Sequence, residues 1–175
     1  MIEVRWHARA GQGAKTAAHL FALATLRTGR SAQAFPEYGP ERRGAPVRAY
    51  TRIDDRPIRR HDSVTRPDAV VVLDPSLLAE PTVAEGIGPA TLVLADADED
   101  APSLDGSRIV SVPAARLAEE AGTRFVNLVM AGALAAALGG PSVEAVEEAA
   151  VEVLGSKADG DAARAAVEEG YRWLS

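Results

Sequence analysis

The chain has 175 residues, a formal net charge of −6 and no cysteine. This length suits a single domain spanning residues 1–175 with a substantial core. The lack of cysteine excludes disulfides, cysteine-ligated iron-sulfur clusters, cysteine zinc sites and a thiol nucleophile.

The first 30 residues predict a strand, a tight turn and a helix. Apolar and polar residues alternate over 2–7, as in a strand with two unlike faces. A glycine-bearing turn follows at 9–13. From Ala14 the apolar residues recur at helical spacing, and Gly29 stands where we expect the helix to stop.

The next segment predicts two strands joined by an irregular loop. Residues 31–35 suit a short strand, and 36–46 hold three prolines and two glycines. Alternation over 47–53 puts Arg48, Tyr50 and Arg52 on one face, which we expect to be wet or to face a partner. A turn at 54–57 ends this strand.

The rest of the chain predicts buried strands followed by helices. Residues 69–73 and 91–95 are continuous apolar runs that suit parallel strands covered on both faces, and 108–112 suits a further strand. We expect helices at 114–121, 125–138, 143–154 and 161–173, the third capped by Ser142. The fold class is therefore α/β, a mostly parallel sheet flanked by helices, with an antiparallel edge strand and a helical C-terminal part.

Nothing in the sequence points to secretion or to a membrane. The N-terminus lacks the basic start, apolar stretch and cleavage site of a secretory signal. The apolar stretch 126–138 is shorter than the roughly 20 residues needed to span hydrocarbon, so we interpret it as a buried core helix. We expect a cytoplasmic protein that binds neither a membrane nor nucleic acid.

Charge is unevenly distributed along the chain. Residues 1–60 hold 12 Lys and Arg against 5 Asp and Glu, whereas the remainder holds 7 against 20. This asymmetry suits an anionic ligand or an acidic partner at the first third of the chain. Pairing between the basic third and the acidic remainder within the fold explains it equally well.

The glycine turn is the first candidate site. Gly11, Gln12 and Gly13 precede the start of a helix, where unpaired backbone N–H groups attract phosphate. The dinucleotide fingerprint requires a third glycine where Thr16 stands, and the phosphate-binding loop requires Gly-Lys-Thr without the intervening Ala14. The alternative is that the glycines only allow close packing of strand and helix.

The proline- and glycine-rich loop is the second candidate site. It mixes aromatic, acidic and arginine residues, and arginine offers a planar fork for carboxylate or phosphate. Ordering such a loop costs entropy, which favours a binding role. A subunit contact in which Arg42 and Arg43 pair with carboxylates is the competing interpretation.

Four segments of the chain resemble the gamma subunit of pyruvate and related 2-oxoacid:ferredoxin oxidoreductases. In order they are RWHARAGQGAKTAA, AFPEYGPERRGAPVRAYTRI, PDAVVVLDPSLL and VNLVMAGALAAALG. The resemblance covers nearly the whole chain. Ala8 departs from it, because the family commonly has glycine at this point.

The resemblance implies a subunit with no catalytic residue, metal or cofactor of its own. Thiamine diphosphate and iron-sulfur clusters would lie on alpha, beta and delta type partners, with ferredoxin involved indirectly and pyruvate as the expected oxoacid. The gamma subunit would contribute assembly contacts and part of a coenzyme A site. The residues that match the family's glycine turn and loop are Arg9, Gly11, Gln12, Gly13, Tyr38, Glu41, Arg42, Arg43 and Gly44.

Other interpretations remain open. One is a stand-alone α/β enzyme that binds a nucleotide or phosphometabolite at the glycine turn, and another is a scaffold subunit with no ligand. In isolation the chain is expected to expose an amphipathic face formed by 47–53 and the loop, and to form a homodimer or to associate with other subunits.

The remaining polar residues carry weaker expectations. The three histidines, His7, His19 and His61, lack metal-ligand spacing. Asp74 follows a central strand, where it either meets a ligand or shapes a turn. A final set of acidic residues, expected to be solvated, is Asp96, Asp98, Glu99 and Asp100.

Overall fold

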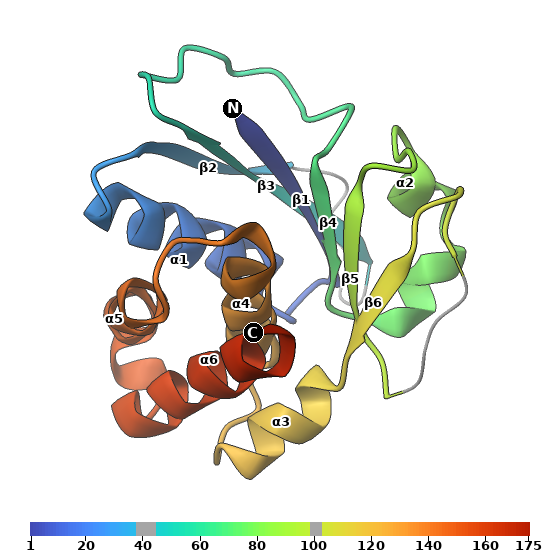
Figure 1. Cartoon of the computed structure of the whole chain (residues 1–175). Helices are drawn as coiled ribbons and strands as arrows, with labels where there is room; N and C mark the ends of the chain where they lie inside the picture. Colours follow the sequence, from blue (N-terminus) through green and yellow to red (C-terminus); the bar gives the residue numbers. More distant parts are fainter. Residues whose placement is uncertain (38–44, 99–102) are drawn as a thin grey trace.

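The computed structural model describes residues 1–37, 45–98 and 103–175, and it contains a six-stranded sheet between two unequal layers (Figure 1). The strands are β1 (Ile2–Arg9), β2 (Ser31–Glu37), β3 (Pro46–Asp54), β4 (Ala69–Val72), β5 (Leu92–Asp96) and β6 (Ile109–Val112). The helices are α1 (Ala14–Arg27), α2 (Pro81–Ala84), α3 (Ala114–Glu120), α4 (Val126–Leu138), α5 (Val143–Leu154) and α6 (Gly160–Leu174). Short 3₁₀ helices η1 (Pro75–Ala79) and η2 (Gly155–Lys157) complete the set.

The sheet has the order β2-β3-β1-β4-β5-β6. Neighbouring strands from β1 through β6 in this order are parallel, whereas β3 runs antiparallel to both β1 and β2. The edge strand β2 is therefore antiparallel to its neighbour, which confirms the expected α/β fold class. Every strand and long helix expected from the sequence is present, with ends that differ by at most a few residues.

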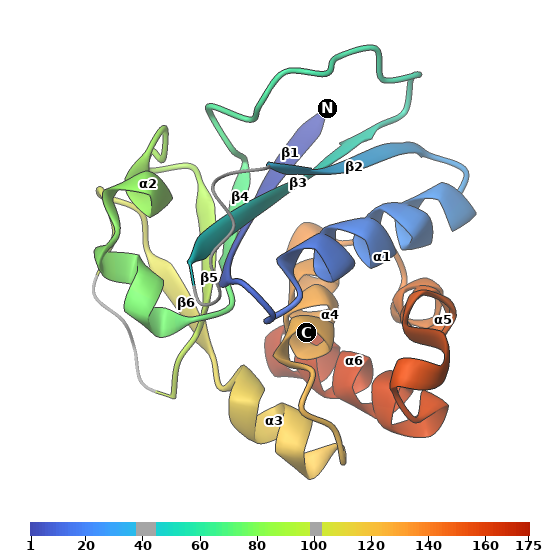
Figure 2. The ribbon, with the colours of Figure 1, turned by 180° about the vertical axis from the view of Figure 1, so that it is seen from behind.

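The larger layer consists of α1 and α3 to α6 on one face of the sheet (Figure 2). Helix α4 lies at its centre, and its residues from Asn127 to Ala135 are all buried, as its continuous apolar sequence predicts. Its backbone approaches α6 at Gly132 and Gly170. A Cβ at Gly170 would lie 1.9 Å from the Val129 carbonyl oxygen, so only glycine allows this crossing.

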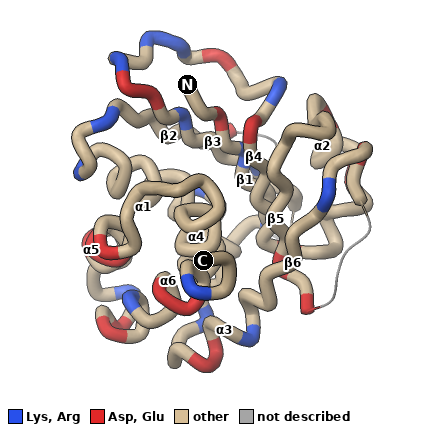
Figure 3. The backbone as a smooth tube through the Cα atoms, in the orientation of Figure 1, with Lys and Arg blue, Asp and Glu red and all other residues tan. Residues whose placement is uncertain are grey.

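The opposite face of the sheet is divided into an apolar half and a charged half. On β4, β5 and β6, small apolar side chains form a separate core under η1 and α2. On β3 and β1 the same face carries arginines and a histidine. Figure 3 shows basic and acidic residues interleaved along 54–68, the segment that follows β3.

The expectation that the Arg48, Tyr50 and Arg52 face of β3 is wet or faces a partner was wrong for Tyr50 and Arg52, whereas Arg48 stays partly exposed. Tyr50 is 2% exposed and Arg52 is fully buried. Arg52 donates to Glu3 on β1 at 2.7 Å and to the Asp62 carbonyl oxygen at 2.6 Å. The chain itself therefore covers this face, because residues of β1 and of the segment after β3 supply partners for its charges.

The short elements η1, α2 and η2 had no counterpart in the sequence prediction. Pro75 and Pro81 each occupy the start of one of these helices, where a missing N–H costs no hydrogen bond. Within the described part of the chain, no helix is long and apolar enough to cross a membrane.

Candidate functional site

The glycine turn connects β1 to α1 through two residues in the left-handed region. Gly11 has φ +100° and Gly13 has φ +90°, which L side chains rarely adopt. A Cβ at Gly13 would also lie 2.9 Å from the side-chain nitrogen of Asn127 on α4. At Gly11 a Cβ would have no neighbour within 4 Å, so open space lies above this residue.

Helix α1 begins without a side-chain cap. Gly13 is the N-cap residue, and no side chain accepts a hydrogen bond from the first turn. That turn contains no acidic residue and includes Lys15. The backbone N–H groups at the start of a helix carry partial positive charge, so this turn favours an anion.

The turn lies at the point where the chain changes direction across the sheet. After β1 the chain leaves toward β2 at one edge, and after the adjacent parallel strand β4 it leaves toward β5 at the other. Ligands of open α/β sheets commonly bind in the crevice beyond the carboxyl ends of two such strands. The glycine turn follows β1 and Leu73 follows β4, and both line a cavity at this crevice, with Asp74 next to Leu73 in the chain.

A polar network spans the crevice. Gln12 accepts from the backbone N–H of Arg9 at 2.6 Å and donates to Asp74 at 2.8 Å. Arg9 donates from Nη2 to the Ser76 hydroxyl at 2.7 Å, and its Nε lies 3.4 Å from an Asp74 carboxylate oxygen. The network therefore fixes the turn against the end of β4.

Asp74 shapes a turn, one of the two roles expected for it. Its carboxylate accepts from the backbone N–H of Ser76 at 3.0 Å and so caps η1. Partial burial would raise the pKa of Asp74, but the hydrogen bonds from Ser76 and Gln12 lower it below its usual value. Asp74 is thus held as a carboxylate inside the network.

A cavity of about 350 Å³ opens beside the turn. Its lining residues are Gly11, Gln12, Leu73, Arg124, Phe125 and Val126. Helix α4 also begins at this cavity, with Phe125 as an N-cap residue that provides no side-chain cap. The exposed Arg124 guanidinium lies over the Phe125 ring at 5.6 Å from its centroid, so two helix starts and a cation meet here.

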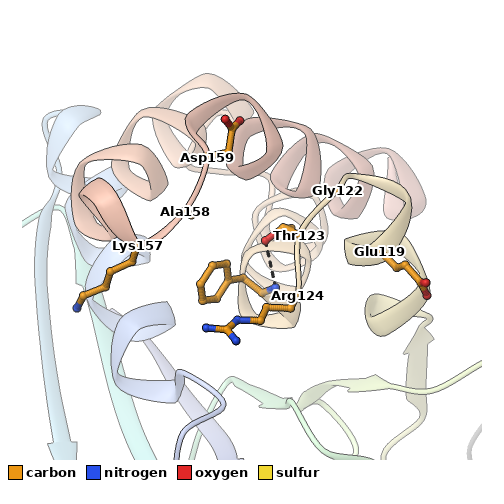
Figure 4. Close-up of a pocket in the computed structure, with 8 residues that line it drawn as sticks. Glu119, Gly122, Thr123, Arg124, Lys157, Ala158 and Asp159 are labelled. Atoms are coloured by element: carbon orange, nitrogen blue, oxygen red, sulfur yellow. Dashed lines mark hydrogen bonds between the residues drawn. The ribbon is translucent and has the colours of Figure 1, made fainter.

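A second cavity of about 430 Å³ shares Arg124 and Phe125 with the first. Figure 4 shows that Lys157, near the start of α6, and Arg124, before α4, belong to different segments around this cavity. Glu119 and Asp159 also line it. Arg124 and Lys157 were not singled out from the sequence, although a basic residue directly before a predicted helix start was a signal that could have identified Arg124.

The sequence-predicted ligand residues fall into two groups. Arg9, Gly11, Gln12 and Gly13 come together at the crevice. The other predicted residues, which lie outside the described part of the chain, are Tyr38, Glu41, Arg42, Arg43 and Gly44.

The described end of this loop meets the glycine turn directly. The backbone N–H of Ala10 donates to the Ala45 carbonyl oxygen at 2.9 Å, and Arg9 pairs with Pro46 across β1 and β3. The two candidate segments, which are about 30 residues apart in the sequence, are therefore adjacent in the fold. Ala8, where the family resemblance departs from glycine, is a fully buried strand residue beside them.

The remaining described polar residues show no sign of a metal site, and Asp96 has a structural role. Asp96 is not simply solvated, because it accepts from the backbone N–H of Ala115 at the start of α3. Burial raises the pKa of Asp96, with the α3 backbone N–H groups acting in the opposite direction. Among the described residues, no group of three or more histidine, aspartate or glutamate side chains is arranged to hold a metal ion.

The family model and the related proteins that match this chain all point to one family of oxidoreductase subunits. A family model described as pyruvate ferredoxin/flavodoxin oxidoreductase matches residues 3–173. The chain is 41% identical to the pyruvate/ketoisovalerate oxidoreductases common subunit gamma of Thermococcus kodakarensis, over 98% of this chain and 96% of that protein. It is 42% identical to the pyruvate synthase subunit PorC of Methanothermobacter thermautotrophicus, over 97% and 96% of the two chains.

A solved structure has the same fold along almost its whole length. The crystal structure of pyruvate oxidoreductase subunit PORC from Thermotoga maritima superposes with a TM-score of 0.84 at 36% sequence identity. The match covers 98% of this chain and 95% of that one. The similarity therefore extends over the sheet, both helical layers and the crevice.

Proposed function

The chain belongs to the gamma-subunit family of the pyruvate ferredoxin/flavodoxin oxidoreductases, and on this basis we propose that it forms part of the coenzyme A site of a multisubunit 2-oxoacid:ferredoxin oxidoreductase. The reaction converts pyruvate and coenzyme A to acetyl-CoA and CO₂, with electrons passed to ferredoxin. The chain contributes binding and assembly contacts to this reaction, and the chemical steps take place on its partners.

The absence of cysteine supports this division of labour. The 175 residues provide no thiolate for a cluster, so the electrons must travel through other subunits. We assign thiamine diphosphate and the iron-sulfur clusters to alpha, beta and delta type subunits. The relatives are themselves named as subunits and match over nearly their full length, which disfavours a stand-alone enzyme.

One observation carries the coenzyme A proposal: the hydrogen bond from Ala10 to Ala45 brings the base of the arginine-bearing loop to the glycine turn. The turn supplies the uncapped start of α1 and the open space above Gly11. The loop supplies Arg42 and Arg43 in sequence. Coenzyme A carries a pyrophosphate and a ribose phosphate, which suit two adjacent anion-binding segments.

The cavity beside the turn fits this ligand chemistry. It is lined by glycine backbone, by Phe125 and by the exposed guanidinium of Arg124. A hydrogen bond to a charged group contributes about 1.5–3 kcal/mol. A few such contacts together with a helix start give useful but moderate affinity, as a substrate that must leave as a product requires.

A scaffold role without a ligand is the alternative, and one observation favours it. The polar groups of Arg9 and Gln12 contact Asp74 and Ser76 within the chain. These two residues would then serve the stability of the turn. The two interpretations differ in whether the arginines beside the turn affect the use of coenzyme A.

The test is steady-state kinetics of the assembled enzyme carrying Arg43→Ala or Arg124→Ala in this subunit. Each change removes a charged hydrogen-bond donor, so we expect the apparent KM for coenzyme A to rise about tenfold or more. The KM for pyruvate and steps that precede coenzyme A binding should barely change.

Arg172→Ala is the control, because Arg172 is an exposed arginine on α6 that pairs only with its helix neighbours Glu168 and Glu169 among the described residues. Its loss should leave the KM for coenzyme A unchanged. If Arg43→Ala and Arg124→Ala enzymes assemble normally with wild-type dependence on coenzyme A, the scaffold interpretation replaces the proposal.

A further inference from the structure

The charged face of β1, β2 and β3 contains an unusual concentration of unsatisfied polar atoms. Within the described residues, five buried side-chain nitrogen or oxygen atoms have no hydrogen-bond partner. Four of them lie on this face, namely Arg5 Nε, His7 Nε2, Gln33 Oε1 and Arg52 Nη1. Buried polar atoms are nearly always paired with protein, water or ligand, so this face is where a missing partner is to be sought.

Arg5 differs from the other arginines of the face. Arg52 is paired with Glu3 at 2.7 Å, and Arg48 is paired with Glu37 at 2.6 Å and Glu85 at 3.0 Å. Arg5 is only 1% exposed, yet its one hydrogen bond in the described structure is from Nη2 to the Val83 carbonyl oxygen at 2.8 Å.

No described carboxylate lies within 4 Å of the Arg5 guanidinium. Every ion pair formed by an arginine of this sheet face involves Arg48 or Arg52 together with Glu3, Glu37, Asp62 or Glu85. A buried guanidinium without an adjacent carboxylate is costly, and burial accordingly lowers the pKa of Arg5. An anion that reached Arg5 would remove that cost.

A cavity of about 290 Å³ lies against Arg5. Its lining residues are Arg5, Glu37, Arg48, Tyr50, Ser63, Val64, Thr65 and Glu85. Both carboxylates in the wall are bound to Arg48, and Glu37 also accepts from the Tyr50 hydroxyl. Arg5 is therefore the cation of this cavity that has no carboxylate partner among the described residues.

We propose that this cavity binds a small monocarboxylate anion, of the size of formate, acetate or pyruvate, with a carboxylate oxygen accepting from the Arg5 guanidinium. The planar guanidinium matches the planar carboxylate. The charged side chains of the wall are two arginines and two glutamates, so the cavity is neutral and suits a single negative charge better than a phosphate dianion. The site is separate from the glycine turn and does not depend on the proposed function.

The binding should be detectable in the wild-type chain without any mutation. We would titrate the ¹⁵N-labelled full chain with acetate at constant ionic strength and follow the arginine Nε–H signals by NMR. We expect one signal, assigned to Arg5 by its absence in Arg5→Lys, to shift saturably with a dissociation constant of about 1–10 mM.

Two variants test the location. Ser63→Trp places a large side chain in the cavity wall, and we expect it to weaken acetate binding about tenfold or more while Arg5 remains in place. Arg30→Lys is the matched control for Arg5→Lys, because Arg30 pairs with the exposed Asp55 at the opposite end of β2. It should leave the acetate titration unchanged.

Three outcomes would overturn the proposal. If the Arg5 signal does not move up to about 50 mM acetate, no monocarboxylate binds at the Arg5 guanidinium. If inorganic phosphate shifts the signal as strongly as acetate does, the monocarboxylate class is wrong. If Ser63→Trp binds acetate as the wild type does, the anion lies elsewhere.

Discussion

At the scale of single residues, His7 shows how strongly the charged face perturbs a side chain. It is 2% exposed, and its Nε2 has no partner among the described residues. Burial lowers the pKa of His7 to about 3, and the positive charges of Arg5 and Arg48 act in the same direction. The imidazole is therefore neutral in the folded protein at neutral and mildly acidic pH.

This neutrality predicts a pH-dependent stability. Because the folded pKa lies below the ordinary value of 6.5, the unfolded chain binds an additional proton as pH falls below 6.5. The stability is therefore highest above pH 6.5 and falls progressively toward pH 3. A change from pH 7.5 to 5.5 should lower the free energy of unfolding by about 1.4 kcal/mol.

Urea unfolding of wild type and His7→Gln at these two pH values measures the effect. The variant should lack this part of the pH dependence, whatever its absolute stability. His19→Gln, which removes an exposed histidine from α1, is the control. A His7→Gln protein that retains the full wild-type difference would contradict the assignment.

Residues of the site were predictable where local chemistry dictates them. Gly11 and Gly13 could be identified from the sequence because a strand-to-helix turn needs positive φ. The burial of Arg5 and Arg52 could not, because alternation along a strand tells which residues share a face and not what covers that face. Their cover comes from Asp62 and Val83, which lie far from them in the sequence or in other elements.

At the scale of elements, the crossing of α4 and α6 depends on two glycines. A Cβ at Gly170 would lie 1.9 Å from the Val129 carbonyl oxygen, and one at Gly132 would lie 2.0 Å from the Val167 carbonyl oxygen. Backbone atoms cannot yield as a flexible side chain does. The two helices must therefore separate to accept any larger residue at either position.

Gly170→Ala should consequently destabilise the fold although alanine is the better helix former. We expect a loss of about 1–3 kcal/mol in the free energy of unfolding, as for an overpacked core, which exceeds the gain of about 1 kcal/mol in helix propensity. Gly160→Ala in the same helix is the control, because its Cβ would lie 3.8 Å from Val151 in ordinary contact. Equal denaturation midpoints for the two variants would show that the crossing adjusts freely.

Long elements were predictable and short ones were not. Helix α5 follows its amphipathic pattern from Val143, with the Ser142 hydroxyl accepting from the Ala145 N–H at 3.3 Å as its capping position predicts. The elements η1 and α2 have no repeat long enough to produce a periodic signal. They form because their apolar side chains, Leu77 and Val83, pack on the apolar half of the sheet, which would otherwise be exposed.

At the scale of the whole molecule, one sheet carries both apolar cores and a few buried charged residues, and the chain packs against both of its faces. The expected exposed amphipathic face does not include Tyr50 and Arg52 of β3, which are covered by the chain itself. In the described part, the exposed large hydrophobic residues are Met1, Leu26 and Trp173, which belong to three different elements or ends. The sequence pattern of one strand therefore could not identify the surface that meets partner subunits, because it does not show what covers the strand.

The purified chain should be colourless and unable to reduce a viologen dye with pyruvate and coenzyme A. With no cysteine it has no thiolates to ligate a cluster. Visible absorption and iron analysis of the isolated chain test this, with the complex recovered from native lysate as the positive control. Stoichiometric iron with a charge-transfer band in the isolated chain would contradict it.

The network of Arg9, Gln12, Asp74 and Ser76 has a consequence for the rate at which the crevice can be occupied. It holds the glycine turn in place before anything arrives, so the backbone N–H groups of α1 are already oriented. An anion that meets these N–H groups need not order the glycine turn, so its encounter with the turn is limited by diffusion and orientation rather than by a rearrangement of the turn. Loosening the network with Gln12→Ala would then slow association more than it changes the contacts of the bound state.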